Sequence, residues 1–232
     1  MLIQGFQKTT LIDYPEKIAC TIFLHGCNFR CGFCHNPELV LTNFNKEYSE
    51  NEILEFLKKK KKYLDAVCIT GGEPLMSLEK DFVKKIKALG YLVKIDTNGS
   101  FPEKLKELLD ENLIDFVSMD IKSSKENYEF VVGKKPDFEK IEQSIKLISG
   151  LENYEFRTTI LENLHNKDEV KKIAEWLNQI KNRPKRFCLQ GFKKQDKLLD
   201  ENFKKQKNTS EEYLNELKKI VENYFERVEV RV

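Results

Sequence analysis

Short runs of β-branched and aromatic residues alternate with longer helical patterns along this 232-residue chain, and no other feature limits its fold as strongly. Such alternation is typical of βα units, which build a parallel sheet. Parallel strands are buried on both faces, so they are expected to be short and apolar. Six segments fit that description: 18–24, 66–70, 91–96, 115–121, 154–160 and 186–190. The sequence therefore predicts an α/β fold.

Capping residues predict where the helices between these strands begin. Ser49 with Glu52 fits a capping box, and Gly90 fits the left-handed end of a helix that Ser77 opens. Each expected N-cap precedes apolar residues at helical spacing: Ser49, Ser77, Asp137, Asn166 and Ser210. We expect one domain over residues 1–232, with a core at about residues 18–192.

The C-terminal part of the chain has a different composition. Residues 193–209 are rich in Lys, Asp, Gln and Asn, which predicts a mobile surface loop. The helix that Ser210 opens follows this loop. Residues 227–232 then alternate polar and apolar side chains, as an edge strand does.

The charge balance excludes some classes of partner. The chain has 40 Lys and Arg against 38 Asp and Glu, a net charge of only +2, so no overall field favours nucleic acid or an anionic membrane. The five lysines at 58–62 suit a helix C-terminus, and no nucleic-acid motif accompanies them. The start lacks the pattern of a signal peptide, and the longest apolar stretch, 18–24, is too short to span a bilayer. A cytoplasmic protein is therefore expected.

Three of the six cysteines share one loop directly after the first predicted strand. Cys27, Cys31 and Cys34 have the spacing C-x3-C-x2-C, which is too tight for an accidental grouping of core residues. With His25 or His35 they would complete a tetrahedral Cys3His zinc site. An iron-sulfur cubane would instead leave one iron without a protein thiolate. The other three cysteines lie within strand candidates and are expected to be core: Cys20, Cys68 and Cys188.

The cysteine loop, with Phe33 just before its last cysteine, resembles the signature of the radical S-adenosylmethionine (SAM) superfamily. One βα unit later, Gly71-Gly72-Glu73-Pro74 resembles the GGEP motif that holds the methionyl amino group of SAM in that family. Glycines allow a backbone to approach a ligand closely, and a carboxylate can pair with an ammonium group.

Further motifs resemble the branch of glycyl-radical-enzyme activating proteins. Asp96-Thr97-Asn98-Gly99 and Asp120-Ile121-Lys122 are similar to the DTNG and D-x-K segments that line the SAM site there. The opening GFQKTTLIDYPEK, together with EFRTT at 155–159 and LQGF at 189–192, resembles anaerobic ribonucleoside-triphosphate reductase activating proteins. The resemblance covers about residues 3–192. The chain departs from it at Glu16, where the family usually has Gly, and at 160–166, which lacks the usual Pro and Gly.

The resemblance implies a partial (β/α)6 TIM-like barrel of the radical SAM type, with its site at the C-terminal ends of the strands. It implies that Cys27, Cys31 and Cys34 ligate a 4Fe-4S cluster and that no side chain beyond the cluster and SAM is catalytic. The residues it implies for cofactor binding are Phe33, Gly71, Gly72, Glu73, Pro74, Asp96, Thr97, Asp120, Lys122, Arg157 and Gln190.

The implied activity is cleavage of SAM to methionine and a 5′-deoxyadenosyl radical. The radical would install a glycyl radical on a partner, an anaerobic ribonucleotide reductase, with flavodoxin or ferredoxin as electron donor. Other substrates stay open: a glycyl radical enzyme of the pyruvate formate-lyase type, a peptide or a small molecule. A zinc-binding interaction module is the more remote alternative.

Overall fold

The computed structural model describes residues 1–41 and 48–232, whose contacts form two compact units. The first unit contains Met1–Asn28, Glu38–Thr97 and Glu103–Val117. The second contains Phe29–Pro37, Asn98–Pro102 and Ser118–Val232. The strand order is β1-β2-β3-β4-β5-β6-β7-β8, so each strand pairs with the next one along the chain. The prediction of one domain over the whole chain stays a prediction.

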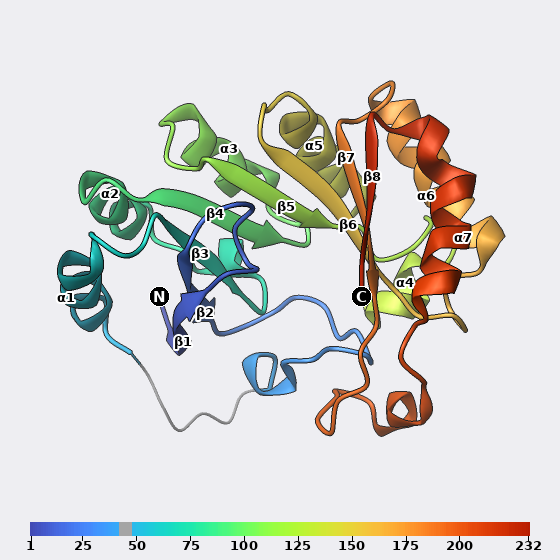
Figure 1. The fold of residues 1–232 in the computed structure, drawn as a ribbon, viewed down its shortest axis with the longest axis horizontal. Helices are drawn as coiled ribbons and strands as arrows, with labels where there is room; N and C mark the ends of the chain where they lie inside the picture. The colour runs from blue at the N-terminus through green and yellow to red at the C-terminus, as the bar shows by residue number, and fades with distance from the viewer. Residues whose placement is uncertain (42–47) are drawn as a thin grey trace. The chain divides into compact units, whose positions relative to one another are not determined.

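The first unit is built on parallel strands with one antiparallel addition. β2 pairs with β3, and β3 with β4, in parallel, whereas β1 pairs with β2 in antiparallel fashion. Figure 1 shows α1 and α2 side by side, and the two helices are in contact. The elements are β1 (Ile3–Thr10), β2 (Ala19–Leu24), η1 (Pro37–Leu39), α1 (Glu50–Lys60), β3 (Ala66–Gly71), η2 (Pro74–Met76), α2 (Lys80–Ala88), β4 (Leu92–Thr97) and α3 (Pro102–Asp110).

The second unit continues the βα pattern. β6 pairs with β7 and β7 with β8, all in parallel, and α6 and α7 lie side by side (Figure 1). The elements are β5 (Phe116–Asp120), which begins in the first unit, α4 (Tyr128–Val132), α5 (Phe138–Ser149), β6 (Tyr154–Ile160), α6 (Lys167–Ile180), β7 (Arg186–Gly191), η3 (Glu201–Lys205), α7 (Glu211–Val221), η4 (Glu222–Tyr224) and β8 (Arg227–Arg231).

All six predicted parallel strands are present, as β2 to β7, and the predicted C-terminal strand is β8. The N-caps at Ser49, Asp137, Asn166 and Ser210 are confirmed, and Ser49 forms the complete capping box with Glu52. The helix start at Ser77 is wrong. Ser77 closes η2, and α2 begins three residues later at Lys80, after an N-cap residue whose side chain makes no capping bond.

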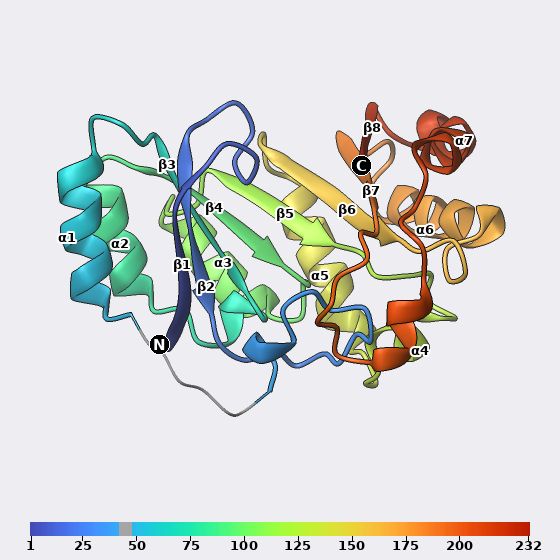
Figure 2. The same ribbon diagram turned by 60° about the horizontal axis from the view of Figure 1, so that its bottom comes forward.

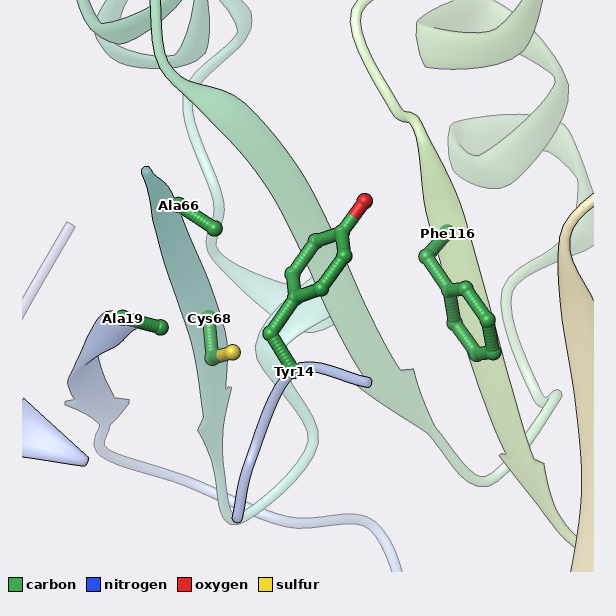
Figure 3. Packing of buried hydrophobic residues seen from close by; sticks show 5 residues of the cluster. All are labelled: Tyr14, Ala19, Ala66, Cys68 and Phe116. Atoms are coloured by element: carbon green, nitrogen blue, oxygen red, sulfur yellow. The ribbon is translucent and has the colours of Figure 1, made fainter. Parts of the chain in front are cut away.

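The segment after β1 covers one face of the first unit's strands. Tyr14 is buried and packs with Ala19, Ala66, Cys68 and Phe116 (Figure 3). In Figure 3 the Tyr14 ring lies between Cys68 and Phe116. The cysteines predicted to be core are confirmed, because Cys20, Cys68 and Cys188 are all buried.

Glu16 lies in the turn that follows Tyr14, and its φ is +60°. This left-handed conformation is one that glycine adopts more easily than other residues. The left-handed backbone gives a physical reason for the glycine that is usual at this position in the family that the chain resembles. No helix in the described residues is long and apolar enough to cross a membrane.

Candidate functional site

In the first unit, the Gly-Gly-Glu-Pro motif and the start of the cysteine loop are bound to each other through their backbones. Glu73 N donates to Gly26 O at 2.7 Å, and Gly72 N donates to Leu24 O at 2.9 Å. A Cβ on Gly72 would lie 2.0 Å from Gly26 O and 3.1 Å from the Cys27 Cβ. Only glycine fits there, so the motif determines the path of the backbone that carries Cys27.

Gly71 must be glycine for a different reason from Gly72. Its φ is +132°, and an added Cβ would lie 2.2 Å from Leu24 O. The preceding strand β3 is in parallel register with β2, where Gly71 is opposite Leu24. Gly71 thus allows β3 to end close against the β2 backbone, and Gly72 allows the chain to lie against Gly26, just after β2.

The Glu73 carboxylate is fully buried at the end of β3. Its Oε1 accepts hydrogen bonds from Leu75 N at 3.1 Å and from the Thr97 hydroxyl at 2.8 Å. Pro74 is the first residue of η2, where its missing N–H costs nothing. The structure therefore brings Glu73, Pro74 and Thr97 together, as a site at the strand ends requires.

Asp96 occupies a different place from its neighbour Thr97. Successive side chains of a strand point to opposite faces, and Asp96 shares its face of β4 with Lys94. The two form an ion pair in which Lys94 is only 3% exposed and Asp96 19%. Lys94 was not predicted as a buried residue, because a lysine within a strand candidate carries no signal of burial.

In the second unit, the rest of the cysteine loop packs into an apolar cluster. Phe33 is 6% exposed and packs with Val131, Leu161, Phe192 and Leu198, with Cys31 against the same cluster. Cys34 N donates to Cys31 O at 3.0 Å, which closes a turn between the two cysteines. Burial raises the pKa of Cys31 to about 11, and the positive charge of Lys122 opposes that shift.

Residues 193–209 are not only a surface loop. They contain η3, and Leu198 is 5% exposed. Asp200 N donates to Gly32 O at 2.9 Å, and the Phe203 ring lies 6.0 Å from the Phe33 ring. This packing was not predicted, because three apolar side chains among many lysines resemble an ordinary solvated segment.

Asp120, Lys122 and Arg157 form the second group of predicted residues that the structure brings together. Arg157 Nε donates to Asp120 Oδ1 at 2.7 Å, and Lys122 Nζ donates to Asp120 Oδ2 at 2.9 Å. Burial alone would raise the pKa of Asp120, but the charges of Arg157 and then Lys122 outweigh it and hold this pKa well below its usual range. Burial likewise opposes the charge on Lys122, and Asp120 outweighs it, so the pKa of Lys122 is raised.

Gln190 lies on the same face of the sheet as Arg157, one row further along. In the register of β6 and β7, Arg157 is opposite Cys188 and Thr159 is opposite Gln190. Gln190 and Cys188 are two residues apart and therefore share a face. Gln190 is half-buried.

His165 forms hydrogen bonds with the backbone next to this group. Its Nδ1 accepts from Leu161 N at 3.1 Å, so its Nε2 carries the proton and donates to Lys122 O at 2.8 Å. His165 directly precedes the α6 N-cap Asn166 and is fully buried. Burial lowers its pKa, which keeps the ring neutral. Its two backbone partners fix the strand end that carries Lys122.

Within the described part of the chain, no three His, Cys, Asp or Glu side chains are grouped so that they could hold one metal ion. Cys27 belongs to the first unit, and Cys31 and Cys34 belong to the second. All three are partly exposed.

Comparison with known proteins gives consistent matches. The family model described as "Radical SAM superfamily" matches residues 21–181. The chain is 35% identical over 207 residues to a Methanocaldococcus jannaschii protein named as a glycyl-radical enzyme activating enzyme (MJ1227), covering 84% of this chain and 81% of that one. It is 31% identical over 189 residues to the pyruvate formate-lyase-activating enzyme of Clostridium pasteurianum, covering 78% of this chain and 77% of that one.

A solved structure shows the same fold. The crystal structure of a domain of a pyruvate formate-lyase-activating enzyme from Bacteroides vulgatus matches with a TM-score of 0.58 and 21% identity, covering 72% of this chain and 99% of that one. The predicted fold class, an α/β partial (β/α)6 barrel of the radical SAM type, is confirmed.

Proposed function

Because this chain belongs to the radical SAM superfamily, we propose that it is a glycyl-radical-enzyme activating enzyme that uses a 4Fe-4S cluster and SAM. The names of the Methanocaldococcus and Clostridium relatives support this activity. One structural observation carries the proposal: the Glu73 N to Gly26 O hydrogen bond ties the Gly-Gly-Glu-Pro motif to the loop that begins with Cys27.

The residues fit the two cofactors in their chemistry. Cys27, Cys31 and Cys34 offer thiolates, which are the usual ligands of an iron-sulfur cluster. Lys122 places a positive charge near Cys31 that favours its thiolate. The close approach of Gly72 to Gly26 keeps the backbone free of side chains beside Cys27. The three thiolates would hold three irons and leave the fourth for SAM.

Glu73 is the proposed partner of the SAM ammonium group. A carboxylate can accept charge-assisted hydrogen bonds from an ammonium group. Thr97 and Leu75 N fix its Oε1 and so set the direction of the carboxylate. Gly71, Gly72 and Pro74 shape the backbone around it, and preorganisation of this kind lowers the entropic cost of binding.

The remaining predicted residues are proposed to hold the rest of SAM. Arg157 and Lys122 keep Asp120 ionised, so the group offers a fixed anion between two cations. Phe33 is proposed to cover the adenine from its apolar cluster, and Asp96 and Gln190 to contact the ligand's polar groups. When bound, cluster and SAM supply a one-electron cleavage of a carbon–sulfur bond and thereby an acceptor for one hydrogen atom. The protein's part is to position the ligands and to exclude water.

The proposed hydrogen donor is a backbone glycine of an anaerobic ribonucleotide reductase. The opening segment and the LQGF segment carry that resemblance. A pyruvate formate-lyase-type enzyme is the second candidate, favoured by the 31% identity to the Clostridium pasteurianum activating enzyme.

The test starts with protein purified anaerobically, reconstituted with iron and sulfide and reduced with dithionite. We expect 5′-deoxyadenosine from SAM in the wild type and none from Cys31→Ala. Each candidate partner is then added separately, and its glycyl radical is measured by electron paramagnetic resonance. A wild-type protein with a full, reducible cluster that forms no 5′-deoxyadenosine would contradict the proposal, and zinc in place of iron and sulfide would favour the interaction module.

A further inference from the structure

The segment 193–209 contacts the cysteine loop of the second unit at successive positions. At Gly32, the Asp200 amide donates to the carbonyl at 2.9 Å, and a Cβ on Gly32 would lie 2.5 Å from the Phe203 ring. At Phe33, Leu198 and Phe203 pack on the ring. Figures 1 and 2 show this segment, in orange, beside the blue cysteine loop. It therefore forms the layer of protein that lies directly over Gly32 and Phe33.

Residues on either side of the segment extend this contact. The ring of His35 lies 5.4 Å from that of Phe192, which directly precedes the segment. At its other end, Thr209 N donates to Phe192 O at 3.0 Å, and the Thr209 hydroxyl donates to Ile160 O at 2.5 Å. The segment is therefore a closed loop anchored at both ends on β6 and β7.

The outer surface of the segment is basic. It contains six lysines against three carboxylates, whereas the whole chain is almost neutral. Lys204 pairs with Glu201 at 2.7 Å. The other five lysines are exposed: Lys193, Lys194, Lys197, Lys205 and Lys207. A surface of one sign beside a site attracts and orients a partner of the opposite sign.

We propose that segment 193–209 is the docking surface for a small acidic electron-transfer protein of the flavodoxin or ferredoxin kind. The inference rests on the proposed function, because a cluster bound at Cys31 and Cys34 must gain one electron in each cycle. The reduced donor loses that electron and the oxidised cluster gains it, with no bond formed or broken. Encounters of redox proteins are typically small and weak, so exposed charge rather than an apolar groove is the expected means of recognition.

Within the segment, the apolar residues and the basic residues have different roles. Leu198 and Phe203 face the cysteine loop and give the segment a fixed position over it. The lysines face solvent and would bring the acidic donor against that layer. The donor's redox group would then be separated from the cysteine loop by this one layer of protein.

The test measures cluster reduction with two kinds of reductant. The variant Lys194→Glu/Lys197→Glu/Lys205→Glu reverses three exposed charges of the segment. The matched control, Lys59→Glu/Lys60→Glu/Lys62→Glu, makes the same change in net charge on exposed lysines of the first unit. Photoreduced flavodoxin and dithionite are each mixed with the reconstituted proteins, and bleaching of the cluster's visible absorbance gives the rate.

At low salt we expect flavodoxin to reduce the segment variant at least roughly ten-fold more slowly than the wild type, and the control at nearly the wild-type rate. Dithionite should reduce all three proteins equally, which also shows that the variants are folded. Added salt should remove most of the difference, because charges further apart than about 10 Å are screened at 0.1 M. Oxidised flavodoxin should also bind the wild type more tightly than the segment variant.

Equal flavodoxin rates in wild type and segment variant would overturn the inference, and so would an equal loss in both variants. The milder Lys194→Gln/Lys197→Gln/Lys205→Gln variant repeats the test if the reversal impairs folding. Failure of the proposed function looks different: with dithionite the wild type would have a reduced cluster but form no 5′-deoxyadenosine, while the flavodoxin rates could still be compared.

Discussion

The Thr97 hydroxyl at the end of β4 donates a 2.8 Å hydrogen bond to Oε1 of Glu73 at the end of β3, and both side chains are buried. The orientation of the Glu73 carboxylate, which follows β3, is therefore fixed by a residue of the neighbouring strand β4. The bond orients the carboxylate that we propose as the partner of the SAM ammonium group.

Replacing Thr97 with Val should therefore weaken SAM binding. A hydrogen bond to a charged group contributes about 1.5–3 kcal/mol, so the KM for SAM should rise roughly ten- to hundred-fold. Thr97→Ser keeps the hydroxyl and should retain most of the affinity. The check is 5′-deoxyadenosine formation against SAM concentration with dithionite as reductant. An unchanged KM in Thr97→Val would show that the bond does not orient Glu73 for binding.

Gly72→Ala should displace the cysteine loop. The new Cβ would lie 2.0 Å from Gly26 O, a distance that real Cβ atoms do not adopt, so the backbone beside Cys27 must move. We expect a loss of ~1–3 kcal/mol in unfolding free energy and much less iron and sulfide bound per chain. Gly150→Ala is the matched control, because its Cβ meets only Leu147 O at 3.4 Å. Equal iron content in both variants would count against the role of Gly72.

The stability of the protein should fall below pH 6.5 because of His165. Burial lowers its pKa, so the folded protein keeps the ring neutral while the unfolded chain binds a proton as the pH falls through about 6.5. His165 therefore opposes folding increasingly under acid conditions, by up to about 1.4 kcal/mol per pH unit. Urea unfolding at pH 7.5 and 5.5 measures this slope.

His165→Gln should reduce that pH dependence, although burial also lowers the pKa of His35, whose part of the slope would remain. The variant should be less stable than the wild type at pH 7.5, because the Lys122 carbonyl and the Leu161 amide lose their fitted partner. An identical slope in both proteins would exclude His165 as the titrating group.

Asp120 gives a linkage of the same sign at lower pH. Its pKa is held below the ordinary value of 3.8, so its contribution to stability is complete above that pH and is lost as the pH falls toward the lowered pKa of the folded state. In Arg157→Gln the pKa of Asp120 should rise and this acid-linked loss should shrink. The same variant should lose about 3 kcal/mol of stability at pH 7, because it removes one partner of a buried pair. Chemical unfolding at pH 7, 4 and 3 would reveal both effects.

Lys94 and Asp96 can be tested by a double-mutant cycle. Lys94→Met leaves the Asp96 carboxylate in a mostly buried place without its ion-pair partner, and should cost about 3 kcal/mol. Adding Asp96→Asn should restore part of that loss, since the carboxylate that lost its ion pair with Lys94 is then neutral. Thermal unfolding of the four proteins gives the coupling energy. Additive effects would show that the ion pair contributes no net stability.

Strands and helix caps followed from the sequence wherever local chemistry determined them. The apolar runs of β2 to β7 and the cap of α1 at Ser49 are set by burial and by one side-chain hydrogen bond. β1 was missed because its half-exposed sequence lacks the apolar run of a buried strand. Ser77 was misassigned because Pro74 starts a separate 3-10 turn, and Ser77 ends that turn instead of opening α2.

The candidate site was predictable as a set of motifs but not as a set of contacts. Glu73 and Thr97 stand 24 residues apart, and only the pairing of β3 with β4 puts the hydroxyl against the carboxylate. Sequence motifs placed Asp96 beside Thr97 in one group, whereas strand alternation turns the two side chains to opposite faces. The burial of Lys94 depends on that same alternation.

The packing of segment 193–209 on the cysteine loop also has a consequence during synthesis of the chain. Leu198 and Phe203 follow His35 by more than 160 residues, so Gly32 and Phe33 leave the ribosome long before the side chains that pack on them. At about 5–20 residues per second the loop stays uncovered for roughly 8 to 30 s. During that interval the loop lacks the packing of Leu198 and Phe203 around Phe33, and this packing can form only after residues 193–209 have been synthesised.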